Sequence, residues 1–415
     1  MNMPTIAGHV LVPATPAQDQ IATEREHLEW GAPLLSLDQF ITREKRVLGI
    51  TDFSTTRRQR WVLVPADNTT TTDFLSACET YRRPILLKRP GNQVQRALSY
   101  SVCSVFVPES KRRNGYAARM MSLLQMNLSP QANIPASLDD VHEIKDSSAV
   151  SANLDADQAE LSDGGNYGRN ATLSFLYSDI GTYYSQFGWK VTGARHVEWT
   201  PRSSSSSSDS DALPAHAQWL TAEDLPELGR ADREYLVSQL ERHSHQENVI
   251  RFALDDPEAT SWRWLIQRSM FYAHTLMPES QTKPIHFGLK LGDSWAVWMF
   301  DFVDKKVAIL RLKFSSPQAF AQLIGAVRRQ AAEFGMAKVV GWNVDLSSLG
   351  VDLAEADQER LKQGEKLDKY EKQLAGGKVV ERSGNSASLP ALAWYGDKKA
   401  GERVEWVANE YGWWC

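Results

Sequence analysis

A serine and aspartate tract divides the chain near its middle and limits how the chain can fold. Residues 203–211 are all serine or aspartate, so they cannot bury apolar surface to offset the entropy of their own ordering. A length of 415 residues also exceeds one ordinary core. We therefore expect two domains, 1–201 and 214–415, joined by a linker at 202–213. A second polar stretch, about 127–170, is expected to be an insertion in the first domain.

The composition excludes several classes of protein. Hydrophobic residues make up 42% and charged residues 23%, as in ordinary globular proteins, and the net charge of -5 argues against a nucleic-acid partner. The three cysteines have no metal-ligand spacing, so we expect no metal and reduced thiols. Since neither a signal peptide nor a membrane segment is recognisable, we expect a cytoplasmic protein.

Hydrophobic periodicity predicts the elements of the first half. A helical region at 16–47 precedes three strand regions, and a second helix begins at Gly115. After the polar insertion come a strand, a helix and a last strand. The predicted strand regions before the insertion are 61–64, 75–87 and 97–107, and those after it are 173–177 and 190–199, with the helix at 180–187.

The second half follows a similar order. Two helices, a three-stranded antiparallel meander, a helix and a strand are predicted, followed by a charged helix and an irregular, aromatic end. We interpret the chain as α+β, with a twisted mixed sheet flanked by helices. Whether the second half is a degenerate copy of the first fold stays open at this point. The predicted segments are 222–246, 261–274, 285–291, 296–302, 307–314, 317–334, 338–343 and 365–374.

A strand, a turn and a helix form the segment with the clearest chemistry. The strand ends at Val105, Phe106 and Val107, and the turn leads to a helix that begins near Gly115. Free backbone N–H groups and the helix dipole at such a position favour an anion such as a pyrophosphate. The alternative is a helix-capping turn with basic neighbours. The expected cofactor-binding residues are Val105, Phe106, Val107, Arg112, Arg113, Asn114, Gly115, Tyr116 and Ala117.

This segment resembles the acetyl-CoA signature of the GNAT superfamily of acetyltransferases, Gln/Arg-x-x-Gly-x-Gly/Ala after the fourth strand. Here the pattern is Arg112-x-x-Gly115-x-Ala117. The resemblance implies a GNAT-like sheet and acetyl-CoA as co-substrate.

A second motif is similar to the superfamily's Tyr-x-x-x-Gly-Phe. It consists of Tyr184, Gly188 and Trp189. The resemblance makes Tyr184 the candidate general acid, since a phenol can protonate the departing thiolate of coenzyme A. Tyr183 is the alternative acid. A purely structural interpretation is that these aromatic residues pack in the core.

An acceptor amine must lose a proton before it attacks the thioester, and a carboxylate is the natural group to assist. Glu79 lies on a predicted central strand and is a candidate base or cation anchor. The alternative is that Glu79 is a surface or salt-bridged strand residue beside Arg82 and Arg83. Glu109 and Asp179 lie in loops at the same predicted end of the sheet, where either can instead be a helix cap or a solvated charge.

The segments around Cys78-Glu79-Thr80, the turn and 176–181 together resemble the fungal lysine N6-acetyltransferase family. That resemblance covers about 75–199 and implies that free L-lysine is acetylated at its side-chain amine. Glu79, Tyr177 and Asp179 are our expected substrate-binding residues. The second half lacks the phosphate-binding turn between 311 and 317, so we expect it to bind no coenzyme A.

The last residues are unusually aromatic for a chain end. One hypothesis is that they insert between the domains and place Glu410 or the carboxylate of Cys415 near the acceptor amine. The alternative is a tail that packs for stability alone.

The leading functional prediction is therefore direct acetyl transfer from acetyl-CoA to a small primary amine, with L-lysine first. The alternatives are a catalytically silent CoA-binding regulator or scaffold and a protein or polyamine N-acetyltransferase.

Overall fold

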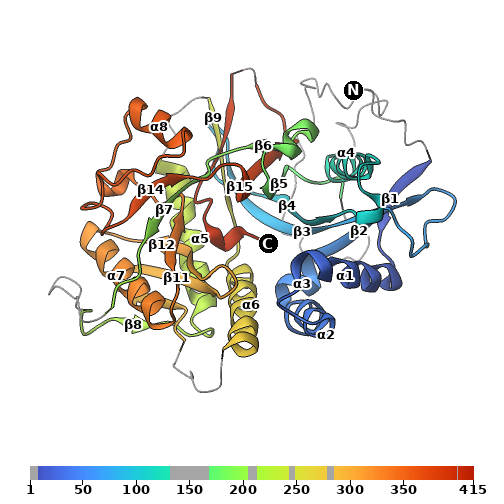
Figure 1. Cartoon of the computed structure of the whole chain (residues 1–415). Coiled ribbons are helices and arrows are strands. Elements are labelled where there is room, and N and C mark those ends of the chain that lie inside the picture. Colours follow the sequence, from blue (N-terminus) through green and yellow to red (C-terminus); the bar gives the residue numbers. More distant parts are fainter. Residues whose placement is uncertain (1–7, 131–167, 204–212, 243–247, 278–284, 400) are drawn as a thin grey trace.

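Two mixed β-sheets with helices packed around them make up the protein (Figure 1). The computed structural model describes residues 8–130, 168–203, 213–242, 248–277, 285–399 and 401–415. The predicted combination of mixed sheets and flanking helices is confirmed.

The first sheet has the order β1-β2-β3-β4-β5-β15-β6, and β9 and β16 extend it beside β3. Its long strand β3 pairs with β2 through its first half and with β9 through its second half. Most pairs are antiparallel, whereas β4 and β5 are parallel. The strands are β1 (His9–Pro13), β2 (Arg58–Pro65), β3 (Ser76–Lys88), β4 (Gln95–Phe106), β5 (Leu173–Ile180), β6 (Lys190–Val191), β9 (Val249–Leu254), β15 (Asn385–Trp394) and β16 (Arg403–Trp406).

Helices cover both faces of this sheet. Successive side chains of a strand point to opposite faces, and apolar side chains are buried on both. On β2, Trp61 and Leu63 pack with α4 (Tyr116–Leu128), whereas Val62 and Val64 pack with α1 (Pro16–Trp30). Helix α1 starts at a capping box and ends at Gly31, so the predicted helical region at 16–47 is interrupted. It continues as α2 (Leu37–Ile41) and a π-helix (Thr42–Leu48), and α3 (Asp52–Arg57) follows.

The second sheet has the order β14-β7-β13-β12-β11-β10-β8. The predicted meander is confirmed as β10, β11 and β12, and α7 then crosses to β13, which lies parallel to β12. The first sheet uses the same arrangement, with α4 joining the parallel strands β4 and β5, so the second half repeats the central motif. The strands are β7 (Arg195–Trp199), β8 (Gln218–Trp219), β10 (Gly288–Leu291), β11 (Ser294–Asp301), β12 (Lys306–Lys313), β13 (Lys338–Trp342) and β14 (Lys378–Glu381). The helices are α5 (Leu225–Arg242), α6 (Thr260–Leu276), α7 (Pro317–Glu333) and α8 (Glu355–Lys362).

Several local predictions were wrong. The charged segment 365–374 forms turns, and the helix lies earlier, at α8. Leu367 and Leu374 are both buried, which explains the helical spacing, but Leu367 bridges to Val379. The irregular end contains β14, β15 and β16. These strands were not predicted from the sequence, because short polar and glycine-containing segments obscure their apolar pattern.

Two glycines also make the region after β5 differ from the prediction. The predicted helix at 180–187 is a short 3-10 helix (Tyr183–Phe187), because Gly181 and Gly188 both have positive φ and leave room for little more than one turn. The predicted strand at 190–199 is two strands in different sheets, β6 and β7.

The chain crosses between the sheets on both sides of the serine tract. β7 precedes the tract yet lies in the second sheet, whereas β9, β15 and β16 follow it and lie in the first. The division into 1–201 and 214–415 stays a prediction, but neither segment completes its sheet alone. Most of the expected linker and insertion lies outside the described residues.

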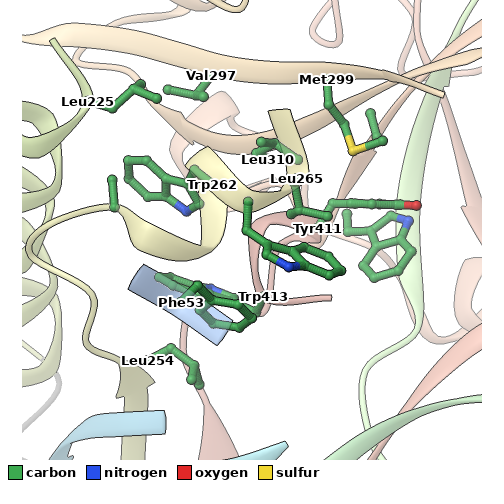
Figure 2. Close-up of a cluster of buried hydrophobic side chains, with 14 of the residues drawn as sticks. Phe53, Leu225, Leu254, Trp262, Leu265, Val297, Met299, Leu310, Tyr411 and Trp413 are labelled. Atoms are coloured by element: carbon green, nitrogen blue, oxygen red, sulfur yellow. The ribbon is translucent and has the colours of Figure 1, made fainter. Parts of the chain in front are cut away.

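A hydrophobic cluster fills the space between the two halves (Figure 2). Trp262 of α6, Met299 of β11 and Leu310 of β12 meet Phe53 of α3 and Trp413 near the end of the chain. Strands and helices from both halves therefore share one core. Among the described helices, none has the length and apolar character needed to cross a membrane.

Candidate functional site

The parallel strands β4 and β5 separate part-way along their length. Their pairing runs from Ser99 and Leu173 to Val102 and Leu176 and then stops. The register between β3 and β4 shifts at the same place, and Ser104 has a φ of 51°. A bulge of this kind turns backbone groups of β4 out of the ladder and toward the opening. Val105 and Phe106 continue past it to the strand's end.

The predicted anion-binding turn lies at the mouth of this opening. Gly115 is the N-cap of α4 with a φ of 78° and receives no side-chain cap, so the first N–H groups of the helix have no intrahelical partner. Arg113 is also left-handed, with a φ of 67°. Asn114 tightens the turn by donating to the carbonyls of Lys111 and Arg112 at 3.2 and 3.1 Å. Successive free N–H groups in such a turn suit a phosphate.

Arg112, at the rim of the turn, can exchange its ion-pair partner for a ligand. Arg112 donates to Glu29 at 2.8 Å, and both side chains are about half exposed. An exposed pair of this kind contributes only about 0–1 kcal/mol, so an anionic ligand can replace Glu29.

The corresponding helix of the second half is closed to an anion. Ser316 caps α7 by accepting from the backbone N–H of Ala319 at 3.1 Å, and Pro317 at the first helical position has no N–H. This difference supports the prediction that only the first half holds the cofactor.

Tyr184 lies on the face of the first sheet that α4 covers. It is 8% exposed and packs in a cluster with Met120 and Leu124 of α4. Burial raises the pKa of its phenol well above the ordinary value, and the neighbouring Tyr183 and Cys78 add to the effect. The side chain is therefore a fully protonated donor at neutral pH, as a general acid must be.

Glu79 lies on the opposite face, at the centre of an ion-pair cluster. Arg58 donates to its Oε1 atom at 2.8 and 2.6 Å, and Arg60 donates to the same oxygen at 2.5 Å. Burial alone would raise the pKa of Glu79, but the two arginines outweigh it and lower the pKa. The other oxygen, Oε2, faces Ser104 at 3.4 Å and Cys103 at 4.0 Å. A carboxylate whose pKa is lowered in this way is better suited to attract a cation than to take up a proton.

The remaining predicted acceptor residues have structural partners. Tyr177 donates its hydroxyl to Asn409 at 2.9 Å, which ties β5 to the tail. Asp179 accepts from the backbone and hydroxyl of Ser388 at 2.8 and 3.1 Å, which fastens the irregular part of β15. Among the described residues, Asp179 is thus bonded to Ser388 and not to the arginines that bind Glu79. Glu109 is in a short 3-10 helix (Glu109–Lys111).

The aromatic tail lies between the two halves, and the letter C in Figure 1 marks its central position. Glu410 accepts from Arg311 and, at 2.8 Å, from the backbone of Leu312. Trp413 is 1% exposed against Trp262 (Figure 2). The structure thus uses Glu410 and Trp413 to anchor the tail in the second half.

Beyond this anchor, the tail reaches the first sheet. Cys415 has its Sγ atom 3.2 Å from the Oγ atom of Ser101 on β4. Arg83, 1% exposed, lies beneath the tail and donates to the carbonyl of Trp413 at 3.5 Å. The structure therefore brings Cys415 to β4, on the same face of the sheet as Cys103 of β4 and its partner Glu79 of β3.

Several of these residues were not predicted. The clamp on Glu79 comes from Arg58 and Arg60, whose only signal was two arginines at alternate positions before an apolar strand. Ser101 and Cys103 gave no signal, and Arg83 was expected beside Glu79 and not beneath the tail, because these contacts involve a tail more than 300 residues away. No cluster of metal ligands occurs among the described residues.

Comparison with known proteins identifies the family of this chain. Residues 196–415 match the family described as the LYC1 GNAT-like C-terminal domain. A relative from Yarrowia lipolytica named lysine acetyltransferase is 26% identical over 428 aligned positions, covering 96% of this chain and 98% of the relative.

Solved structures with a similar chain path include a GCN5-related N-acetyltransferase from Kribbella flavida, with 15% identity, a TM-score of 0.43, and coverage of 93% of this chain and 72% of that one. A tandem GNAT protein from the clavulanic acid biosynthesis pathway has 8% identity, a TM-score of 0.37, and coverage of 94% and 99%. Since the family match spans more than half of the sequence, this chain belongs to the LYC1 GNAT-like family and is a GNAT acetyltransferase.

Proposed function

We propose that this protein transfers an acetyl group from acetyl-CoA directly to the primary amine of a small molecule, and that the side chain of L-lysine is the acceptor. The observation that carries the proposal is the opening between β4 and β5 with the uncapped start of α4 at its mouth. The Yarrowia lipolytica relative, named lysine acetyltransferase, supports the choice of acceptor.

The residues of the turn fit the cofactor. The free N–H groups from Arg113 to Ala117 would bind the pyrophosphate, with Arg112 at the rim. Val105 and Phe106 at the end of β4, and Val107 directly after it, would hold the extended arm of the cofactor. When bound, acetyl-CoA supplies the activated acetyl group.

Tyr184 is proposed as the general acid. Because burial keeps its phenol protonated, it can give a proton to the departing thiolate and be reprotonated afterwards. Its helix lies directly after β5, one of the two strands that form the opening.

Glu79 is proposed to attract the substrate ammonium ion. Its Oε2 atom faces the bulge, and Arg58 and Arg60 keep the carboxylate ionised. Cys415 approaches the same place from the tail, and its thiol has a pKa lowered first by a hydrogen bond with Cys103. Cys415 is thus proposed to assist proton removal from the amine, while Glu79 attracts the ammonium ion.

An acceptor panel tests the proposal. Purified protein is mixed with acetyl-CoA and lysine, polyamines, a lysine-containing peptide or buffer, and loss of the thioester absorbance is followed. Lysine-dependent turnover with acetylation at the side-chain amine, located by mass spectrometry, is expected. Binding of acetyl-CoA without turnover on any acceptor would make the protein a regulator, and faster turnover on the peptide would make it a protein acetyltransferase.

A further inference from the structure

Two cysteine thiols meet where the tail touches the first sheet. Ser101 and Cys103 are alternate residues of β4, paired with Tyr81 and Glu79 of β3, so their side chains point to the same face. Alternate side chains of a strand are only about 7 Å apart. The Sγ atom of Cys415 contacts Ser101 Oγ at 3.2 Å and therefore lies within reach of the thiol of Cys103.

The surroundings make the two thiols chemically unequal. A hydrogen bond between them raises the pKa of Cys103 and lowers that of Cys415, and Arg83 and Ser101 lower the pKa of Cys415 further. Cys415 is therefore the more acidic of the two thiols and the first to ionise. A thiol next to the sulfur that is oxidised first can trap that oxidised sulfur as a disulfide.

The third cysteine has none of these features. Cys78 is fully buried with Trp61 and Met120, and burial strongly raises its pKa. It lies on the other face of β3 from Glu79, because neighbouring residues of a strand point to opposite faces. Cys103 and Cys415, in contrast, are both partly accessible. Cys78 is a matched control in the same chain.

We propose that Cys415 and Cys103 form a reversible disulfide in response to peroxide, and that this bond locks the tail onto β4 and stops acetyl transfer. The Cys415 thiolate attacks one peroxide oxygen, the O–O bond breaks, and a sulfenic acid and one water form once the leaving hydroxide is protonated. The Cys103 thiol then attacks the sulfenic sulfur, the S–O bond breaks, and a second water leaves. Two thiols are oxidised, and one hydrogen peroxide is reduced to two waters.

The bond would form at the acceptor end of the site. Cys103 Sγ lies 4.0 Å from the Glu79 Oε2 atom, and the next residue, Ser104, forms the bulge. A sulfur bridge at this position holds Cys415 against β4 and occupies space in front of Glu79. The loss of activity rests on the proposed function, whereas formation of the bond does not.

The bond is tested in the whole protein without reference to activity. Wild-type protein is treated with hydrogen peroxide, the remaining thiols are alkylated, and digested peptides are analysed by mass spectrometry. The expected product is a peptide pair joining Cys103 to Cys415 that has lost two hydrogen atoms and separates with dithiothreitol. Cys78→Ser should form the same pair, and Cys103→Ser and Cys415→Ser should not. If the wild type does not form this pair, the proposal is overturned, whatever other modification is found.

The consequence for the tail is measured separately. Hydrogen exchange of the peptide at 407–415 should slow after peroxide treatment of the wild type and remain unchanged in Cys103→Ser. The rate of acetyl transfer, relative to the same protein before treatment, should fall at least about tenfold in the wild type and recover with dithiothreitol. A linked protein with unchanged exchange and activity would refute the locking role. A protein with no activity before treatment would refute the proposed function and leave the linkage and exchange results valid.

Discussion

Glu410 should make the stability of this protein depend on pH in a way that one substitution removes. The carboxyl group is 7% exposed and bonded to Arg311 and the backbone of Leu312, yet burial raises its pKa from 4.5 to about 7. Ionisation of Glu410 is therefore less favourable in the folded protein than in the unfolded chain, in spite of Arg311. The pair anchors the tail at a net electrostatic cost.

The direction in which stability changes with pH follows from proton binding. Between about pH 4.5 and about pH 7 the folded protein holds a proton on Glu410 that the unfolded chain has lost, so this group's contribution to stability falls as pH rises and is constant above about pH 7. At about 1.4 kcal/mol for each pH unit, the interval corresponds to about 3 kcal/mol. Glu410→Gln has no such proton to lose. The difference in free energy of unfolding between variant and wild type should therefore shift by about 3 kcal/mol in the variant's favour from pH 4.5 to pH 8.

Urea unfolding monitored by tryptophan fluorescence at several pH values measures this shift. Only the change of the difference with pH is used, so a constant packing penalty from the new amide beside Arg311 does not affect the result. Glu405→Gln, a change of the same charge on a half-exposed residue of β16, is the control. Parallel pH curves for wild type and Glu410→Gln would show that the burial argument is wrong.

Three further substitutions test the site. Gly115→Trp should abolish acetyl-CoA binding in a calorimetric titration while the protein stays folded, because a large side chain at the N-cap covers the free N–H groups. Normal affinity would show that this turn does not bind the cofactor. Tyr184→Phe should lower kcat about 100-fold or more with little change in cofactor affinity, whereas Tyr183→Phe should not; equal effects would remove Tyr184 as the acid. Glu79→Gln should raise the KM for the amine and lower stability by about 3 kcal/mol, since Arg58 and Arg60 lose a buried charged partner; an unchanged KM would argue against the cation-anchoring role.

The strand, turn and helix from Val105 to Leu128 could be predicted from the sequence because each signal is local. An apolar run, a glycine with positive φ and apolar residues at helical spacing act within one or two turns of chain. The meander β10–β12 was predicted for the same reason, with short polar turns between apolar strands. The same locality misled the prediction at 365–374, where Leu367 and Leu374 have helical spacing but are buried in turns.

The site itself depends on contacts that no local pattern contains. β15 pairs with β5 across more than 200 residues, and Cys415 meets Ser101 across more than 300. The ion pairs of Glu79 join β3 to Arg58 and Arg60 of β2, and Arg58 also binds Asp19 of α1, so the lowered pKa of the Glu79 carboxyl exists only when these elements have packed.

The sequence by itself therefore determined the glycine turn at the start of α4, the strands on either side of that helix and the lack of a glycine turn at 311–317, because helix starts and strand ends follow from neighbouring residues. Only the tertiary structure decided what lies opposite that turn. It brought the tail between the halves, clamped Glu79 with two arginines and placed two thiols together. Partner choice between distant segments is decided by how all the buried surfaces fit at once, and the burial and charge environment that gives each side chain its chemistry appears only in the folded protein.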